Sequence, residues 1–470
     1  MPIEPPPHGA HGAVHQQPQP PGPPASSHDG DHTMTMPGAM MHRGPVWPHV
    51  ANIGLGVWLM TGAAAMGSPT WAMRVSDLVS GALVLALSLL SLSSHPFWKF
   101  WAPWANSLVG VWLLFAPLVF WSRAAEYTND TLVGTFVIIF AVLAPGMPGM
   151  RMLPGPDAPP GWSYNPSSWS QRSPIIALAA VGFFLSRQMT AYQLEHITSF
   201  RDPFFGDGTV RVLTSEVSRA FPIPDAGLGA VAYMIEVLMG FMGDKARWRT
   251  MPWMVTFFGI LVVPLGVVSI TLMILQPVAV GAWCTPCLIA AVAMLVMVAL
   301  TLDEVVAMVQ FLVQARQEGQ SLWEVFWAGG TLHAAPASTA VVVRPDVISP
   351  GALVWGVTLP WNLVATIVAG VWLMVAPAIF GTTGSAAHSD HVVGALIVTV
   401  AAIALAEVGR ATRFVNVLFG AWIVAAPWLL NGATASAAWS DGIAGALVVV
   451  LSVPRGRIRE QYGWSERLIR

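Results

Sequence analysis

The chain has 470 residues, of which 55% are hydrophobic and only 10% charged, and its formal net charge is −2. Soluble globular domains carry about 25% charged residues, so this composition excludes an ordinary soluble protein and indicates a membrane protein. The near-neutral charge gives no reason to expect a nucleic-acid partner. Continuous apolar runs of about 20 residues predict membrane-spanning helices, and they argue against the short alternating segments of a β-barrel.

The N-terminal segment, residues 1–46, is rich in proline, glycine and histidine and has little apolar surface to bury. We expect a disordered tail, and because it lacks the pattern of a cleaved signal peptide, the first spanning helix is expected to direct insertion. Histidines and methionines in this tail could bind a soft or borderline metal such as copper: His8, His11, His15, His28, His32, Met34, Met36, Met40 and Met41. Their spacing follows no fixed ligand geometry, which favours a plain polar tail.

Four segments of the chain share one spacing. The segments that begin at Asn52, Asn106, Thr366 and Asn416 each place Gly four residues on, Trp six residues on, and Ala or Pro eleven residues on. An Asp follows 13 or 14 residues later, and a Gly follows that Asp after four more residues; the four acids are Asp77, Asp130, Asp390 and Asp441. Each unit predicts a hairpin of two apolar helices.

The repeated residue types favour packing and anchoring over a ligand site. The Asp is expected to open the second helix, where a carboxylate accepts backbone N–H groups and meets the positive end of the helix dipole. The Gly predicts a close approach of the two helices, and the Trp predicts an anchor near the membrane interface.

This repeat resembles the SPW repeat family of bacterial membrane proteins. The resemblance covers about residues 47–146 and 355–453, with "AP" endings at Pro117 and Pro377 and an "APW" ending at Trp428, whereas the first unit ends in "GAA". It implies a membrane domain but no defined biochemical activity. We therefore expect seven segments: a tail (1–46), an SPW-repeat domain (47–146), a linker (147–172), a different central unit (173–318), a linker (319–350), a second SPW-repeat domain (351–456) and a basic C-terminal tail (457–470).

The central unit has apolar runs at residues 174–192, 226–243, 252–275 and 284–302, which predict four helices. Basic residues fall at one end of these helices, and the positive-inside rule assigns that end to the cytoplasm: Arg172, Lys245, Arg247, Arg249 and Arg316. With four helices before this unit and four after it, we expect an all-α polytopic membrane protein of about 12 transmembrane helices. Both termini would be cytoplasmic, in a bacterial inner membrane.

Cys284 and Cys287 are the only cysteines and lie at the head of the fourth central run, at its outward-facing end. Placement at a helix N-terminus lowers a thiol pKa from about 8.5 to about 3.5–7.5, so the thiolate becomes abundant at neutral pH. The compartment outside a bacterial inner membrane also permits disulfides. The pattern favours a redox-active dithiol; a retained inactive pair, or metal ligation with an unseen partner, remain alternatives.

The central unit resembles the vitamin K epoxide reductase family. "WCTPCLIAAVAML" is similar to the family's active-site pair at the head of its fourth helix, and "VLTSEVSRAFPIPDAGLGAVAY" is similar to the stretch that leads into its second helix. The resemblance implies a four-helix membrane oxidoreductase that passes electrons from a thioredoxin-like protein to a quinone. It places Ser215 at the family's polar position and Tyr233 in the second helix.

The chain departs from the family in the loop before that second helix. The family usually carries a second cysteine pair there, which relays electrons, but the later of those positions is Thr209 and the loop has no cysteine. A relay by thiol–disulfide exchange needs thiols, so a substrate dithiol must reach Cys284 or Cys287 directly. We expect a mixed disulfide on Cys284 as the more exposed member, and the resemblance implies that Cys287 passes electrons to the quinone.

Five further residues are candidates for the site. Ser215, Phe221 and Tyr233 could line an apolar quinone pocket, although each could equally be a packing residue. Glu236 lies in the middle of an apolar run, where a carboxylate costs at least about 2.5 kcal/mol, so we expect it to be protonated, paired or part of a proton path. His196 could also move protons, although a loop histidine is more often solvated.

The function indicated is a membrane thiol-disulfide oxidoreductase that uses a quinone and a thioredoxin-like extracytoplasmic partner. The alternative is a non-catalytic membrane scaffold or sensor with a degenerate reductase-like centre.

Overall fold

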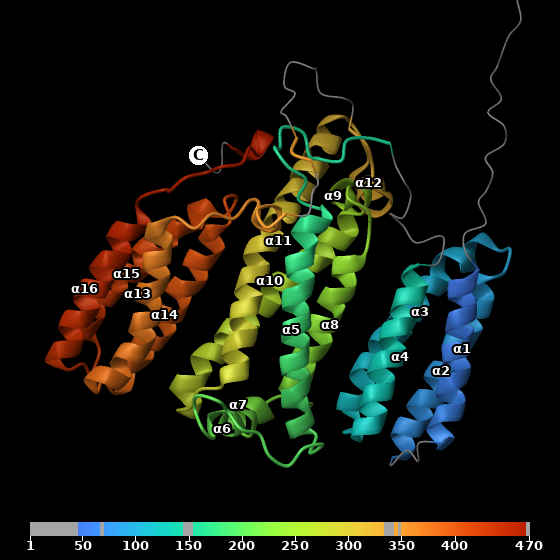
Figure 1. The fold of residues 1–470 in the computed structure, drawn as a ribbon, viewed down its shortest axis with the longest axis horizontal. Helices are drawn as coiled ribbons and strands as arrows, with labels where there is room; N and C mark the ends of the chain where they lie inside the picture. Colours follow the sequence, from blue (N-terminus) through green and yellow to red (C-terminus); the bar gives the residue numbers. More distant parts are fainter. Residues whose placement is uncertain (1–45, 66–69, 144–153, 333–342, 346–348, 467–470) are drawn as a thin grey trace, which may run out of the picture. The chain divides into compact units, whose positions relative to one another are not determined.

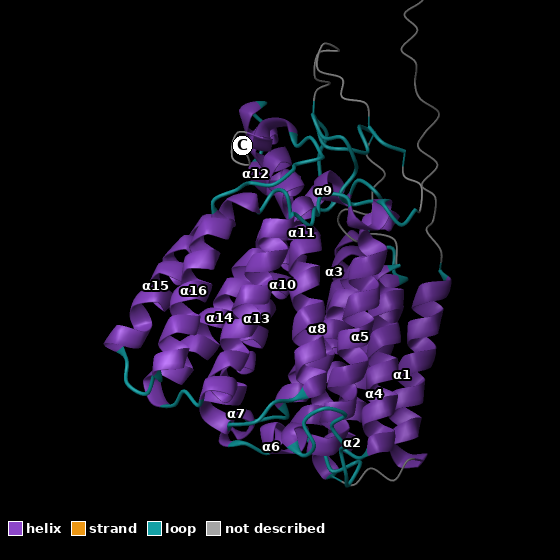
Figure 2. Ribbon diagram, turned by 60° about the vertical axis from the view of Figure 1, so that its left-hand side comes forward, coloured by secondary structure: helices purple, strands orange, loops and turns teal. Residues whose placement is uncertain are grey.

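A computed structural model describes residues 46–65, 70–143, 154–332, 343–345 and 349–466. The expected N-terminal tail and its candidate metal ligands lie outside these residues, apart from residue 46. Figure 2 shows that the described residues form helices joined by loops, without a strand. Twelve of the helices are long: α1 (Trp47–Ala65), α2 (Trp71–Ser91), α3 (Pro96–Val119), α4 (Ala124–Val142), α5 (Trp169–Gln193), α8 (Asp225–Phe241), α10 (Pro252–Leu275), α11 (Thr285–Gln317), α13 (Trp361–Phe380), α14 (Gly384–Leu405), α15 (Val415–Leu429) and α16 (Ala435–Ser452).

Nine helical stretches in the described part of the chain are long and apolar enough to cross a membrane. The three long helices outside that set, α1, α4 and α8, pack against α2, α3 and α5 respectively. The chain is thus an all-α polytopic membrane protein, as predicted. The number of about twelve spans stays a prediction.

The repeat segments form four helical hairpins, α1–α2, α3–α4, α13–α14 and α15–α16, each with a glycine on either side of its contact. A Cβ atom added at Gly56 would lie 2.7 Å from the carbonyl oxygen of Gly81, and one at Gly110 would lie 2.8 Å from that of Gly134. The other two hairpins repeat this contact with the pairs Gly370–Gly394 and Gly420–Gly445. The close approach predicted from the repeated glycine is confirmed, because only a residue without a Cβ fits at these crossings.

The prediction that each Asp opens its helix is wrong. Each of the four acids lies seven residues after the N-cap of its helix and is almost completely buried. At two of the helix starts a threonine takes the capping role: Thr70 accepts the N–H of Met73, and Thr434 accepts that of Ala437, both at 3.2 Å. Seven residues are two turns of helix, so the acids face the interior of the repeat domain rather than its end.

The buried acids meet in pairs across the hairpins. Asp77 of the first hairpin hydrogen-bonds Asp130 of the second. Asp390 of the third hairpin lies close enough to Asp441 of the fourth for their charges to interact, without a hydrogen bond between them. Two carboxyl groups can share a hydrogen bond only when one of them carries a proton. Asp77 and Asp130 therefore join the two hairpins of the N-terminal repeat domain.

The repeated tryptophans also connect neighbouring hairpins, through hydrogen bonds of their indole N–H groups. Each indole N–H donates to the residue immediately before an Asp of the neighbouring hairpin, at 2.8–3.0 Å: Trp58 to Asn129, Trp112 to Ser76, Trp372 to Ser440 and Trp422 to Ser389. These side chains are 41–54% exposed, as expected for rings at a lipid-facing surface. The exchange of hydrogen bonds gives each repeat domain an internal two-fold pattern.

The central unit contains α5, α8, α10 and α11. Figure 1 shows α6 (Gly208–Leu213) and α7 (Glu216–Arg219) at one end of these helices, with α9 (Arg247–Thr250) and α12 (Leu322–Ala328) at the other. We name the first the cysteine end, because α11 begins there, and the second the arginine end. Between them lies a core that includes Tyr233, Phe258 and Met294.

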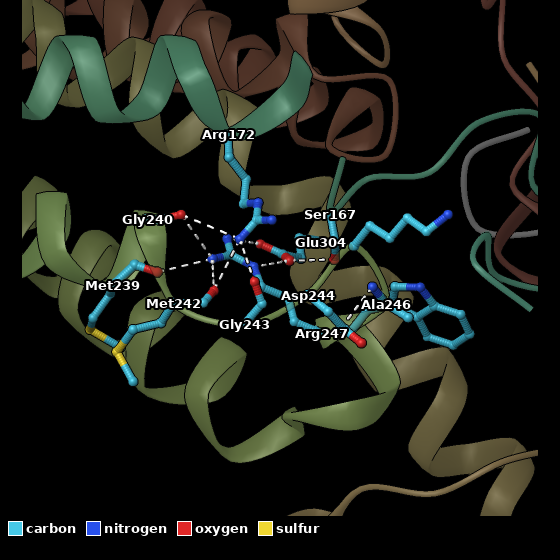
Figure 3. A network of polar contacts seen from close by, with 12 residues as sticks. Ser167, Arg172, Met239, Gly240, Met242, Gly243, Asp244, Ala246, Arg247 and Glu304 are labelled. Atoms are coloured by element: carbon cyan, nitrogen blue, oxygen red, sulfur yellow. Dashed lines mark hydrogen bonds and ion pairs between the residues drawn. The ribbon is translucent and has the colours of Figure 1, made fainter. Parts of the chain in front are cut away.

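The arginine end is held by buried charges that are paired. Arg247 forms a two-point ion pair with Glu304, at 2.5 and 2.6 Å, and the two side chains are only 1% and 3% exposed. Arg247 also donates to the carbonyl of Met239, while Arg172 donates to that of Met242 at 3.0 Å (Figure 3). These contacts satisfy the carbonyl groups at the end of α8, which have no partner within the helix.

Candidate functional site

Cys284 and Cys287 form a disulfide at the start of α11. Cys284 is the N-cap residue of this helix, and its Sγ accepts the backbone N–H of Cys287 at 3.3 Å. The backbone N–H of Cys284 donates to Oε1 of Gln276 at 3.0 Å, in the π-helical turn η1 (Gln276–Val280) that ends α10. The predicted position of the pair at a helix head is confirmed.

The two cysteines differ in exposure, and in the opposite sense to the prediction. Cys284 is 0% exposed, whereas Cys287 is only partly buried. The expectation that Cys284 is the more exposed member is therefore wrong. It rested on distance from the helix end, but Leu213 of the loop and Met189 of α5 pack over the pair, and the Met189 sulfur lies 3.5 Å from Sγ of Cys287.

Cys287 borders a cavity of about 120 Å³ inside the cysteine end. Its walls come from α5, α8, α10, α11 and the loop, and they are mainly apolar. Two of the predicted lining residues, Ser215 and Tyr233, border it. Phe221 does not: it is 36% exposed and borders a neighbouring surface depression that shares Leu213 and Ser218 with the cavity.

The polar groups of Ser215 and Tyr233 already have partners. The Tyr233 hydroxyl donates to the carbonyl of Ala290 at 2.9 Å and so ties α8 to α11 beside the disulfide. The Ser215 hydroxyl donates to the carbonyl of Val212 and accepts the N–H of Ser218 as the N-cap of α7. Both residues shape the cavity wall, and neither presents an unpaired polar atom to it.

One part of the cavity wall is polar, and this part was not predicted from the sequence. Ser218 donates to Asp225 at 2.7 Å and accepts from Gln193 at 2.8 Å, and these side chains hold the loop to the ends of α5 and α8. Gln276, which binds the backbone of Cys284, also borders the cavity. The available signal was a glutamine at the edge of each of two apolar runs.

The two candidate proton carriers lie apart. His196 lies beyond the end of α5, and its Nε2 is 2.7 Å from the carbonyl oxygen of Ser122. Glu236 is 0% exposed in the middle of α8, and neither of its oxygens has a hydrogen-bond partner among the described residues. Neither residue borders the cavity.

Comparison with known proteins agrees with this geometry. Residues 173–302 match the vitamin K epoxide reductase family. Residues 46–144 and 360–454 match the SPW repeat domain. The reductase-like unit is therefore flanked by two repeat domains, as predicted. No curated protein and no solved structure matched the chain.

The loop of this reductase-like unit is held by a carboxylate. The Asp202 carboxylate is 3% exposed and accepts the backbone N–H of Thr285 at 2.8 Å, together with the hydroxyl groups of Thr285 and Thr209. Burial alone would raise the pKa of Asp202, but these hydrogen bonds outweigh it and hold the pKa below the usual range. Sequence reasoning missed Asp202, although an Asp-Pro turn in a loop without cysteines was visible.

Proposed function

We propose that this chain is a membrane thiol-disulfide oxidoreductase that passes two electrons from a substrate dithiol to a quinone. One observation carries the proposal: Cys287, half of a disulfide at a helix head, borders an apolar cavity. Small-molecule sites are typically apolar with a few placed polar groups. The match of residues 173–302 to the reductase family supports the same chemistry.

The reaction has two halves. A substrate thiolate attacks the disulfide, one cysteine leaves as a thiolate, and a mixed disulfide forms on the other. The second substrate thiolate then attacks this mixed disulfide, which releases the oxidised substrate and leaves Cys284 and Cys287 reduced. The two cysteine thiolates take up the two protons that the substrate thiols released, and the pair then gives two electrons and two protons to the quinone, which leaves as hydroquinone while the disulfide re-forms.

The two cysteines take different steps of this reaction, according to where their sulfur atoms lie. The contact of Cys287 with the cavity supports its role as the donor to the quinone. Cys284 takes the role of exchange with the substrate dithiol, which requires the loop above it to move, because its side chain is completely buried. No loop cysteine is present to relay electrons, so the substrate meets this pair directly.

We further propose a location and a partner. The grouping of Arg172, Arg247 and Arg249 at the arginine end supports a cytoplasmic position for that end in a bacterial inner membrane. Both termini are then cytoplasmic and the cysteines lie near the outer face. A thioredoxin-like extracytoplasmic protein is the corresponding source of the dithiol.

A non-catalytic scaffold or sensor is the second candidate function. Two observations favour it: Cys284 is sealed, and the cavity of about 120 Å³ is smaller than the roughly 300–1,000 Å³ of common ligand sites. In this alternative the disulfide stabilises the head of α11 and does not turn over.

The two functions are separated by reoxidation of the reduced protein. Purified protein in detergent is reduced with dithiothreitol, freed of reductant and mixed with a soluble short-chain quinone, and quinone absorbance is followed. The parent should consume one equivalent of quinone as its disulfide re-forms. Cys287→Ser should consume none, whereas Val292→Ser, a control on the exposed face of the same helix, should behave as the parent.

The scaffold function makes the opposite prediction. In that case dithiothreitol should fail to reduce the pair in the folded protein, or the reduced protein should leave the quinone unchanged. Quinone consumption by Cys287→Ser at the parent rate would also contradict the proposed oxidoreductase.

A further inference from the structure

We infer that Asp202 is a positioning residue for the dithiol reaction, because it ties the loop over Cys284 and places a fixed negative charge at the head of the cysteine helix. The inference rests on the proposed thiol chemistry of Cys284 and Cys287, but not on the identity of the electron acceptor.

The contacts of Asp202 connect three pieces of the cysteine end. Within the loop, its carboxylate accepts the backbone N–H groups of Phe204 and Phe205, each at 2.9 Å, which closes a tight turn. Further along, it accepts the hydroxyl of Thr209 in α6. On α11, it accepts the N–H and the hydroxyl of Thr285, the residue next to Cys284. One side chain thus joins the turn, α6 and the first residue of α11.

We call the hydrogen bonds that Asp202 makes with Thr209 and Thr285 the clamp, and this clamp determines access to Cys284. Thr209 and Leu213 both belong to α6, and Leu213 packs against Cys284. A carboxylate that holds Thr209 to Thr285 therefore also holds Leu213 over the sulfur. Release of the clamp is the step that opens Cys284 to a substrate thiolate.

The clamp stands where a cysteine relay would operate. The reductase-family match includes Thr209, the position at which the resemblance places a loop cysteine. In this chain the loop is attached to the active-site helix by hydrogen bonds, which form and break without a change of oxidation state. The loop over Cys284 can therefore open without oxidation or reduction of any loop residue.

The charge of Asp202 acts on the chemistry as well. All of its partners in the described residues are neutral donors, so its negative charge is not cancelled by a cation. The head of a helix favours a thiolate, and a carboxylate bound to the N–H of Thr285 opposes that effect. Stabilising the reduced form makes a dithiol–disulfide pair more oxidising. Asp202 has the opposite effect: its charge destabilises the thiolate of the reduced form, and this makes the pair a better electron donor.

The charge is tested with Asp202→Asn, which keeps the size of the side chain, and with Asp207→Asn as the matched control. Asp207 is an exposed carboxylate in the same loop. Each full-length protein is equilibrated in detergent with glutathione buffers at about pH 8, near the pKa of a free thiol, and the oxidised fraction is read by alkylation. Asp202→Asn should shift the equilibrium about tenfold toward the dithiol, which is about 30 mV for a two-electron couple. Asp207→Asn should stay within about twofold of the parent.

The clamp is tested separately with Thr209→Val, which removes one hydrogen bond and keeps the charge. The disulfide of this variant should be reduced by dithiothreitol several-fold faster than that of the parent, with the glutathione equilibrium within about twofold of the parent value. Asp202→Asn should show both the faster reduction and the shifted equilibrium. Thr209→Val also remains informative if Asp202→Asn does not fold.

Two results would overturn the inference. The charge has no special role if Asp202→Asn and Asp207→Asn shift the equilibrium equally. The clamp has no role if Thr209→Val and the parent are reduced at the same rate. Both measurements are made without quinone, so a failure of the quinone assay above leaves them valid, and a positive quinone assay does not depend on them.

Discussion

The repeat domains and the central unit bury carboxyl groups in different ways. In the N-terminal repeat domain, Asp77 and Asp130 share a hydrogen bond with each other, which requires a proton between them. In the central unit, Glu304 meets the guanidinium of Arg247, and Asp202 meets five neutral donors. The repeat acids are thus joined by a shared proton, whereas Glu304 and Asp202 are placed to stay ionised. Of these, only Asp202 lies next to the cysteines, where an uncompensated charge can affect the chemistry.

The largest effect is expected from Glu304→Gln, because it leaves Arg247 buried without its counter-charge. Breaking a buried ion pair from one side costs about 3–5 kcal/mol, and the loss should appear as a strongly lowered melting temperature in detergent. The control is Asp157→Asn in the pair with Lys245, whose side chains are about half exposed, and it should change stability by about 0–1 kcal/mol. Equal losses in the two variants would contradict the importance of burial.

A smaller effect is expected from Gly110→Ala in the repeat domain. The added Cβ would lie 2.6 Å from Ile138 Cγ1 and 2.8 Å from the carbonyl oxygen of Gly134, so the hairpin must open, at a cost of about 1–3 kcal/mol. Gly54→Ala is the matched control in α1, because nothing lies within 4 Å of its added Cβ, and it should cause no loss. Thermal unfolding of both variants in one detergent measures the difference, and equal melting temperatures would show that the hairpin contact does not require glycine.

The smallest effect is expected from Asp77→Asn. An amide at position 77 can accept a hydrogen bond from a protonated Asp130 or donate one to an ionised Asp130, so the contact is kept and stability should change by no more than about 1 kcal/mol. This is the same acid-to-amide change as Glu304→Gln, made in the other region. A loss as large as that of Glu304→Gln would show that Asp77 acts as a charge with an opposing partner, and it would remove the difference between the two regions.

Local pattern was sufficient for some predictions. The four hairpins followed from a repeated spacing, and the glycine contacts followed from the lack of a side chain at Gly56 and its counterparts. The cysteines at the head of α11 followed from their place before a long apolar run. In each case the relevant contacts lie within one helix or between neighbouring helices of a hairpin.

Other features depend on where distant segments meet. The spacing that identified Asp77 and Asp130 gave no sign that their helices begin two turns earlier, nor that the two carboxyl groups face each other. The burial of Cys284 depends on a loop residue about 70 positions before it, Leu213. Polar pairing of this kind depends on side-chain directions in three dimensions, which periodicity does not encode.

By itself, the sequence determined that this is an all-α membrane protein with two repeat domains, a reductase-like centre and one dithiol, because hydrophobic runs, repeat spacing and cysteine number are properties of the chain as written. The tertiary structure alone decided which sulfur is sealed, which borders the cavity, and which carboxylate holds the loop over them. The physical reason is that exposure and hydrogen-bond partners arise when the loop folds back on the head of α11. Asp202 and Thr285 are 83 residues apart in the chain and meet only there.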